Sequence, residues 1–99
     1  TKLMNEQKKD FIPPNPDFSF FITTISIQAS IALGKIANPA TNKMEEDLTQ
    51  AKFLIDTLGM LQEKTKGNLD TNESKLLENL LYELRSAYLS KSDKKGGQG

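Results

Sequence analysis

Apolar residues recur every three or four positions in two stretches of the chain, which is the spacing of one face of an α-helix. Residues 72–90 carry one such stripe, made of Leu76, Leu77, Leu80, Leu81, Leu84, Ala87 and Tyr88. Residues 48–66 carry another, made of Leu48, Ala51, Leu54, Ile55, Leu58 and Leu61. Because only residues 67–70 separate the two stretches, we predict that they pack as an antiparallel helical hairpin.

The stretch 18–37 is ambiguous, because its β-branched and aromatic residues would favour a strand by propensity alone. It contains no proline, however, and it is too long for an ordinary strand. Asp17 stands where a helix N-cap is expected, and Asn38-Pro39 follows the last residue. We therefore predict an all-α, three-helix arrangement, with helices at about 18–37, 48–66 and 72–90.

Capping signals mark the ends of the second and third predicted helices. Asp47 followed by Gln50 is a capping-box arrangement, which predicts that the second helix begins at the next residue, Leu48. Gly67 is expected in the left-handed conformation after the end of that helix. Thr71 is the predicted N-cap of the third helix.

The polar ends of the chain divide it into three parts. Residues 1–16 finish with Pro13-Pro14-Asn15-Pro16, which prevents helix propagation, so we expect a flexible arm there. Residues 17–91 form the expected helical domain, in which Thr41-Asn42 indicates a turn between the first two helices. Residues 92–99 are rich in Lys and Gly and form the expected flexible tail.

The first predicted helix is apolar on two sides. Its main stripe consists of Phe18, Phe21, Ile22, Ile25, Ala29, Ala32, Leu33 and Ile36. A second stripe lies nearly opposite and consists of Phe20, Ile27 and Ile31, and a strip of small residues separates the two: Ser19, Thr23, Ser26, Ser30 and Gly34. The hairpin can cover only one side. Gln28 lies in a polar seam with Thr24 and Lys35, where it either fixes the register of an interface or faces water.

The other two helices also carry apolar pairs on their far sides, and each pair is seven positions apart. A core of this size barely offsets the conformational entropy of ordering the chain, so burial between subunits would stabilise it. We predict a homo-oligomer with these candidate interface residues: Phe20, Ile27, Ile31, Gln28, Phe53, Met60, Tyr82 and Leu89. The alternatives are a monomer with an apolar groove for an unidentified protein partner, and a peripheral membrane protein that contacts lipid through the first helix.

The composition excludes several classes of function. The sequence contains no His and no Cys, which removes the usual zinc ligands, the common general base and the thiol nucleophile. Thirteen Lys and Arg balance thirteen Asp and Glu, and Arg85 is the single arginine, so we expect no nucleic-acid partner. The apolar stretch 18–33 is too short to span a membrane. We expect a non-enzymatic protein without metal or cofactor, located by default in the cytoplasm.

Three charged clusters have plain structural explanations. Glu45-Glu46-Asp47 precede a helix, where acids complement the helix dipole, so we do not interpret them as a cation site. Residues 64–68 lie at a helix C-terminus, which is the wrong end for a phosphate, and we interpret them as a cap. Lys52 and Asp56 are expected to form a solvated pair four residues apart on the second helix.

Several motifs occur together between Asp17 and Leu89: Asp17-Phe18-Ser19-x-Phe21, Asn38-Pro39-x-Thr41, Asp47-Leu48-x-x-Ala51-Lys52, Leu54-Ile55, Asp56-x-Leu58, Met60-Leu61-x-x-Lys64-Thr65-Lys66-Gly67-Asn68-Leu69, Glu73, Leu76-Leu77-Glu78 and Leu81-Tyr82-x-Leu84-Arg85. They resemble a bacterial family described only as a domain of unknown function, numbered eighteen forty-four. The resemblance implies a short helical protein and brings no catalytic residue. Ser74 departs from the Glu that similar sequences place there, which implies a weakened capping box with Thr71.

Overall fold

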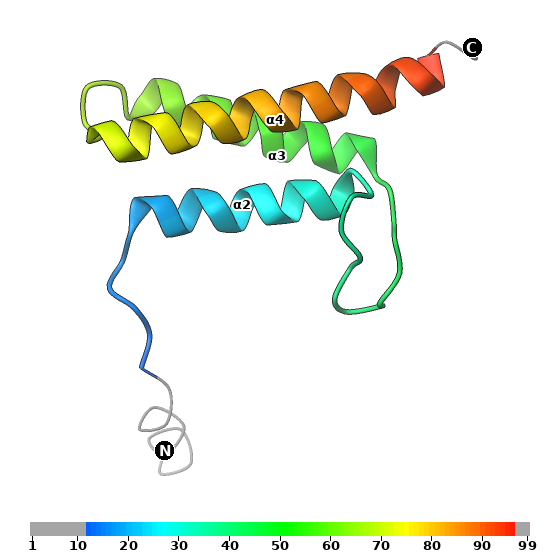
Figure 1. The fold of residues 1–99 in the computed structure, drawn as a ribbon, viewed down its shortest axis with the longest axis horizontal. Coiled ribbons are helices and arrows are strands. Elements are labelled where there is room, and N and C mark those ends of the chain that lie inside the picture. The colour runs from blue at the N-terminus through cyan, green and yellow to red at the C-terminus, as the bar shows by residue number, and fades with distance from the viewer. Residues whose placement is uncertain (1–11, 97–99) are drawn as a thin grey trace.

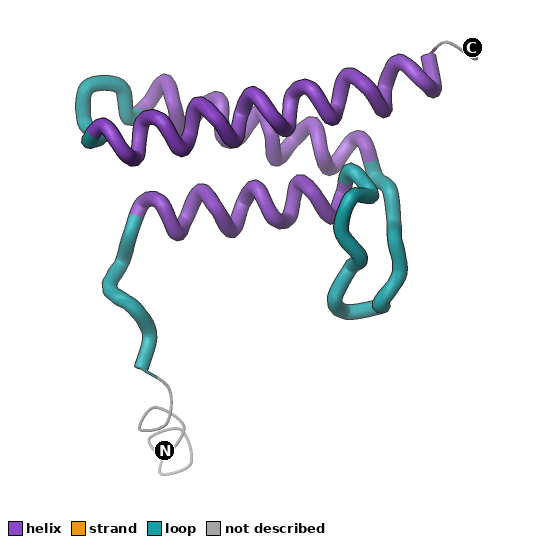
Figure 2. The backbone as a smooth tube through the Cα atoms, in the orientation of Figure 1, coloured by secondary structure: helices purple, strands orange, loops and turns teal. Residues whose placement is uncertain are grey.

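Three α-helices form the secondary structure of residues 12–96, the part of the chain that the computed structural model describes, and no strand is present in that range (Figure 1). They are α2 (Phe18–Ala32), α3 (Leu48–Lys64) and α4 (Thr71–Gly96). Helices α3 and α4 form the predicted antiparallel hairpin, and α2 runs in the same direction as α4 (Figure 2). Each helix packs against the other two, so the predicted all-α, three-helix fold is confirmed.

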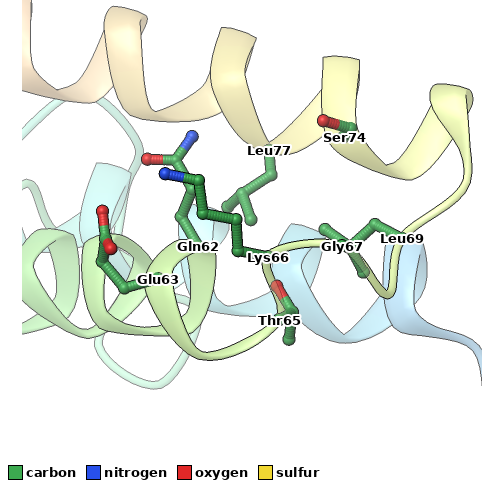
Figure 3. Close-up of a pocket in the computed structure, with 8 residues that line it drawn as sticks. All are labelled: Gln62, Glu63, Thr65, Lys66, Gly67, Leu69, Ser74 and Leu77. Atoms are coloured by element: carbon green, nitrogen blue, oxygen red, sulfur yellow. The ribbon is translucent and has the colours of Figure 1, made fainter.

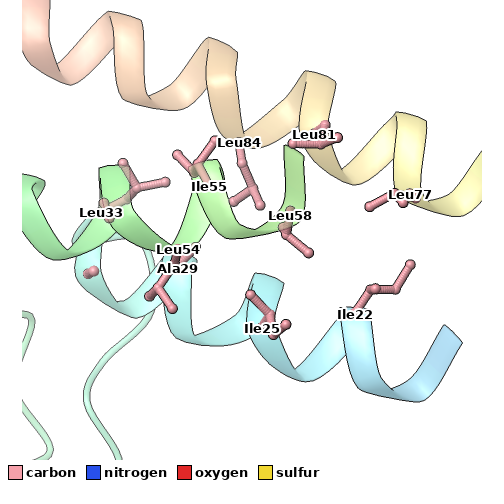
Figure 4. Packing of buried hydrophobic residues seen from close by; sticks show 12 residues of the cluster. Ile22, Ile25, Ala29, Leu33, Leu54, Ile55, Leu58, Leu77, Leu81 and Leu84 are labelled. Atoms are coloured by element: carbon pink, nitrogen blue, oxygen red, sulfur yellow. The ribbon is translucent and has the colours of Figure 1, made fainter. Parts of the chain in front are cut away.

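The core is one apolar cluster between the three helices (Figure 4). Its buried residues are Ile22, Ile25, Ala29, Ala32, Leu33, Ala51, Leu54, Ile55, Leu58, Leu77, Leu81 and Leu84. On each helix they recur at intervals of three and four residues, as the predicted stripes require. Ile22 points from α2 toward α4, and Leu77 points from α4 into the same space.

Helix α2 ends at Ala32, five residues before the predicted end. Gly34 has a φ of +78°, which places it in the left-handed region. The Gly34 N–H donates to the Ile31 carbonyl at 3.0 Å, and the Lys35 N–H donates to the Ser30 carbonyl at 3.0 Å. This pair of bonds is the Schellman motif, which ends a helix at a left-handed glycine. The prediction of a helix to residue 37 was wrong because it treated Gly34 as an interior residue.

Backbone bonds close the base of the connection between α2 and α3. The Asp47 N–H donates to the Ala32 carbonyl at 2.7 Å, and Leu33 and Glu46 form an isolated antiparallel bridge. Asp47 also caps α3, because its Oδ1 accepts from the Gln50 N–H at 3.1 Å. The predicted cap is therefore confirmed, and the cap residue additionally ties the start of α3 to the end of α2.

The tip of this connection is a tight turn, as Thr41-Asn42 predicted. Asn42 has a φ of +61°, and the Asn38 N–H donates to the Lys43 carbonyl at 2.8 Å. The Glu45 carboxylate holds the turn from below, because it accepts from Asn38 Nδ2 at 3.0 Å and from Thr41 Oγ1 at 3.1 Å. The connection is thus ordered by its own hydrogen bonds at both base and tip.

Helix α4 is capped by Asp70 rather than by Thr71. Asp70 Oδ1 accepts from the Glu73 N–H at 2.8 Å, and Glu73 Oε1 accepts from the Asp70 N–H at 3.0 Å. These two bonds make a complete capping box. The predicted Thr71 cap is wrong, and Ser74 does not weaken the start of the helix, because the box lies one position earlier.

The remaining helix ends differ from the prediction to different extents. Helix α3 ends at Lys64, two residues early, and Gly67 has the expected left-handed φ, at +84°. Helix α4 continues to Gly96, so residues 92–96, which were predicted to be tail, are helical. In the predicted arm, residues 12–16 form no helix, and residues 1–11 lie outside the described range, as do 97–99 at the other end.

Candidate interaction surface

The side of α2 that faces away from the core is apolar and open to solvent. Phe20 is 60% exposed and Ile27 is 46% exposed, while Ile31 is half-buried. These positions lie opposite Ile22 and Ala29, which are fully buried. The two apolar sides predicted for this helix are therefore both present, one inside the bundle and one outside. We call Phe20, Thr24, Ile27 and Ile31 the α2 outer face.

No charged residue occurs within α2. Thr24 and Gln28 provide the polar groups on this side, and the Thr24 hydroxyl is already used, because it donates to the Phe21 carbonyl at 2.6 Å. Gln28 is exposed in the single copy, which is compatible with both of its predicted roles. Charges begin only at the helix ends, with Asp17 before α2 and Lys35 after it. A solvent-facing helix surface normally carries charged side chains, so this surface resembles one that is covered.

Two residues assigned to the main stripe of α2 are exposed instead. Phe21 is 50% exposed and Ile36 is 44% exposed. Phe21 is rotated by about 100° from Ile22, which takes it to the edge of the buried arc. Ile36 lies beyond the Schellman turn, where the helical spacing no longer applies. Phe21 adds apolar area next to the α2 outer face, since it lines a hollow together with Phe20 and Thr24. The predicted burial of Phe21 and Ile36 was wrong because the buried arc is narrower than the predicted stripe and the helix ends before residue 36.

Shallow hollows flank the α2 outer face at both of its ends. One, of about 510 Å³, lies at the start of the helix and is lined by Pro16, Phe18, Phe20, Phe21 and Thr24. The other, of about 400 Å³, lies where the end of α2, the connection and α3 meet, and it has a mixed lining of apolar and polar residues: Gln28, Ile31, Ala32, Asn38, Pro39, Glu45, Asp47, Gln50 and Leu54. No sequence pattern indicated the second hollow, because the folded connection forms one of its walls.

The other candidate interface residues lie on different sides of the bundle. Phe53 and Met60 are exposed on α3, opposite its buried residues. Tyr82 and Leu89 are exposed on one flank of α4. Since the helices surround one core, their outward sides point in different directions, and these pairs do not join the α2 outer face in one patch. The structure therefore brings together the candidates on α2 and separates them from the other four.

Leu89 contributes to a groove of about 290 Å³ between α3 and α4, together with Ile55 and Tyr88. Lys52 and Asp56 form its rim, with the Lys52 Nζ 2.8 Å from Asp56 Oδ2, as predicted for this pair. The hydrogen bond and charge of Asp56 raise the pKa of Lys52 above its ordinary value of 10.5. Both side chains are well exposed, so the pair is a solvated surface contact and not a reactive lysine.

The turn between α3 and α4 also encloses a small pocket, of about 290 Å³ (Figure 3). Leu77 points into it from α4, while Gln62 and Lys66 border it on the α3 side. The N-terminal amides of α4 would be the natural anion-binding groups here, but the capping box already engages the Glu73 N–H. The Thr65 hydroxyl is used as well, because it donates to the Leu61 carbonyl at 2.6 Å.

The three consecutive acids before α3 point to separate partners. Glu45 holds the turn of the connection, Asp47 caps α3, and Glu46 Oε2 lies 3.3 Å from Lys91 Nζ on α4. Within residues 12–96, no cluster of three or more His, Cys, Asp or Glu has the arrangement of a metal site. Over the same range, none of the helices combines the length and apolar character needed to cross a membrane.

Comparison with known proteins assigns the chain to a family without assigning an activity. Residues 15–90 match the family described as Domain of unknown function (DUF1844). The chain belongs to this family. The match covers the three helices up to residue 90, including the α2 outer face and the connection, and it confirms the resemblance that the motifs indicated. No curated protein and no solved structure matches the chain.

Proposed function

We propose that this DUF1844 chain is a non-enzymatic interaction module that works by associating with a second copy of itself. The observation that carries the proposal is the α2 outer face, on which Phe20 and Ile27 are exposed over a helix without any charge. Burial of apolar surface contributes about 25 cal/mol per Å² removed from water. A small three-helix bundle buries only a modest fraction of its apolar surface within one chain, so burial between two chains would add to its stability.

Contact with a lipid surface is the weaker explanation of the same face. Helices that lie in the headgroup region of a membrane usually combine an apolar side with Lys and Arg on the polar side. Helix α2 contains neither, and its polar positions are Ser, Thr and Gln. A second protein surface of similar apolar character fits this composition better than an anionic bilayer.

Two substitutions separate association from folding. Ile27 is exposed and Ile25 is buried, and they are two residues apart on the same helix. We expect Ile27→Asp to leave a folded protein that dissociates, because the charge is placed on the outer face. We expect Ile25→Asp to unfold the protein, because the same charge enters the core.

Sedimentation velocity and circular dichroism would measure the two effects separately. The proposal predicts a dimer or higher oligomer for the native chain at tens of micromolar and a helical monomer for Ile27→Asp. A native chain that is a monomer at that concentration would overturn it. A native chain that is a monomer but co-sediments with liposomes would favour the lipid explanation, and capture of a different protein by the exposed face would favour a heterologous partner.

A further inference from the structure

We propose that α2 of one copy pairs antiparallel with α2 of a second copy across a twofold axis that passes between Thr24 and Ile27. This inference rests on the proposed self-association and specifies its geometry. The spacing of the outer face, the charges at the ends of α2 and the hollow beside Ile31 each support it.

The α2 outer face has the spacing of a helix-pairing seam. Phe20, Thr24, Ile27 and Ile31 are separated by four, three and four residues, which is the alternation of the core positions in a coiled coil. The fifteen residues of α2 extend over about 22 Å, so the seam contains two layers on each side of the axis. In an antiparallel pair, Phe20 of each copy lies opposite the partner's Ile31, and Thr24 lies opposite the partner's Ile27.

Charges at the two ends of α2 distinguish the antiparallel pair from a parallel one. Asp17 precedes the helix and Lys35 follows it, with no charge between them. Antiparallel pairing places Asp17 of each copy at the same end as the partner's Lys35. Parallel pairing would place two aspartates at one end and two lysines at the other. Like charges at close range oppose binding and opposite charges favour it, so the two residues that flank α2 favour the antiparallel arrangement. Glu45 and Asp47 lie in the connection at the Lys35 end, where their carboxylates already accept hydrogen bonds within the chain.

The surface is shaped to receive the largest side chain of the seam. The hollow of about 400 Å³ beside Ile31 has an apolar part, formed by Ile31, Ala32, Pro39 and Leu54, and a polar part, formed by Gln28, Asn38, Glu45, Asp47 and Gln50. Antiparallel pairing carries the exposed Phe20 ring of the partner to this end of the helix. A ring that is 60% exposed in the single copy would therefore pack on the apolar part of a preformed hollow, and the symmetry axis produces the same contact twice.

The segments that leave α2 at its two ends are consistent with this position of the partner. In Figure 1 and Figure 2, residues 12–17 and the connection between α2 and α3 both project from α2 on the side away from α3 and α4. A partner helix laid along the outer face would lie between them. In the antiparallel pair, each copy's residues 12–17 would lie beside the partner's connection.

Disulfide trapping tests the orientation without interference, since the native chain contains no cysteine. Phe20→Cys and Ile31→Cys would each be oxidised alone and then as a mixture, with one variant carrying a mass tag. Antiparallel pairing predicts cross-linked dimers in the mixture only. When either variant is oxidised alone, the two cysteines of an antiparallel pair would lie about 16 Å apart along the helix axis, which is beyond the reach of a disulfide. Cross-linking of either variant alone would show parallel pairing and overturn the proposal.

Failure of the orientation is distinguishable from failure of self-association. Sedimentation of the reduced variants reports whether a dimer exists, whatever its geometry. A dimer that gives no cross-link in any sample would keep the proposed function and overturn the α2 pairing. A monomeric native chain would overturn both.

A charge reversal provides a second readout in the native cysteine-free chain. Lys35→Glu replaces the lysine beside the partner's Asp17 with an acid at each end of the pair, and we expect the dimer dissociation constant to rise about tenfold. Lys75→Glu on α4 makes the same change of net charge away from the seam and should leave the constant unchanged. If the two reversals had equal effects on the dissociation constant, or if Lys35→Glu had none, Asp17 would not lie beside the partner's Lys35 and the antiparallel pairing would be wrong.

Discussion

Individual glycines in this small bundle have opposite roles, which depend on backbone conformation and on the space around Cα. Gly59 lies in the interior of α3, where glycine is less favourable than alanine by about 1 kcal/mol. A Cβ atom there would meet the Arg85 guanidinium at 3.0 Å, which is the mobile end of a long side chain. Gly67 has open space around it but a φ of +84°. Backbone strain therefore decides the cost of a side chain at Gly67, whereas the space beside Arg85 decides it at Gly59.

Alanine substitutions at these two glycines should change stability in opposite directions. We expect Gly59→Ala to raise the free energy of unfolding by about 0.5–1 kcal/mol, because Arg85 can shift aside. We expect Gly67→Ala to lower it by about 1–2 kcal/mol, because alanine is strained in the left-handed region. Urea unfolding followed by circular dichroism measures both. A loss of stability in Gly59→Ala would show instead that the packing of Arg85 against α3 is worth more than the gain in helix propensity.

The Lys52–Asp56 pair gives a prediction for pH. Asp56 raises the pKa of Lys52 in the folded state, so the pair stabilises the fold below pH 10.5 and this contribution is lost as pH rises through the higher folded value. Asp56→Asn should lower the Lys52 pKa toward its ordinary value, as measured by an NMR titration of the lysine side chain. Asp93→Asn removes an acid elsewhere on the surface and should leave the Lys52 pKa unchanged.

At the scale of the elements, most of the fold could be predicted from the sequence, and the errors lie at helix ends. The stripes of α3 and α4 were predicted correctly because apolar spacing depends only on helix geometry. The end of α2 was missed although Gly34 and Gly67 carry the same signal. The apolar residues Ile36 and Ala37 follow Gly34 and suggested that the helix continues, whereas polar Asn68 follows Gly67 directly. The extension of α4 to residue 96 was missed because Lys- and Gly-rich sequence was read as tail.

The capping box of α4 can be tested by a matched pair of substitutions. Asp70→Ala removes the acceptor for the Glu73 N–H and should lower the free energy of unfolding by about 1 kcal/mol. Thr71→Ala changes the neighbouring exposed residue, which makes no cap bond, and should be nearly neutral. Chemical denaturation of both variants gives the comparison. A larger loss for Thr71→Ala would restore the threonine as the cap.

At the scale of the whole molecule, the candidate surface could be predicted only in part. The exposed stripe of α2 followed from the two-sided pattern of the helix, because a side opposite the core must face outward. The hollow beside Ile31 could not be predicted, since it depends on where the connection folds back and places Pro39. The separation of Phe53, Met60, Tyr82 and Leu89 from this surface likewise depends on the packing of three helices rather than on any one of them.

Self-association predicts that heat stability depends on protein concentration. A process that binds the folded chain and not the unfolded chain raises the apparent stability by mass action. We expect the midpoint of thermal unfolding to rise by about 3 °C for each tenfold increase in concentration. In Ile27→Asp the midpoint should be independent of concentration. A midpoint that is constant for the native chain over two decades would contradict association in this range.

The backbone clamp at the base of the connection makes the loop and the bundle separable for engineering. The Asp47 N–H bond to the Ala32 carbonyl joins the two helix ends directly, so the excursion from residue 36 to residue 45 can be exchanged or enlarged without changing how α2 meets α3. A reporter domain inserted between Ala40 and Thr41, which are both exposed, should be tolerated by the fold. The same insertion would sterically block the second subunit, so a single inserted domain would give a folded chain that stays monomeric.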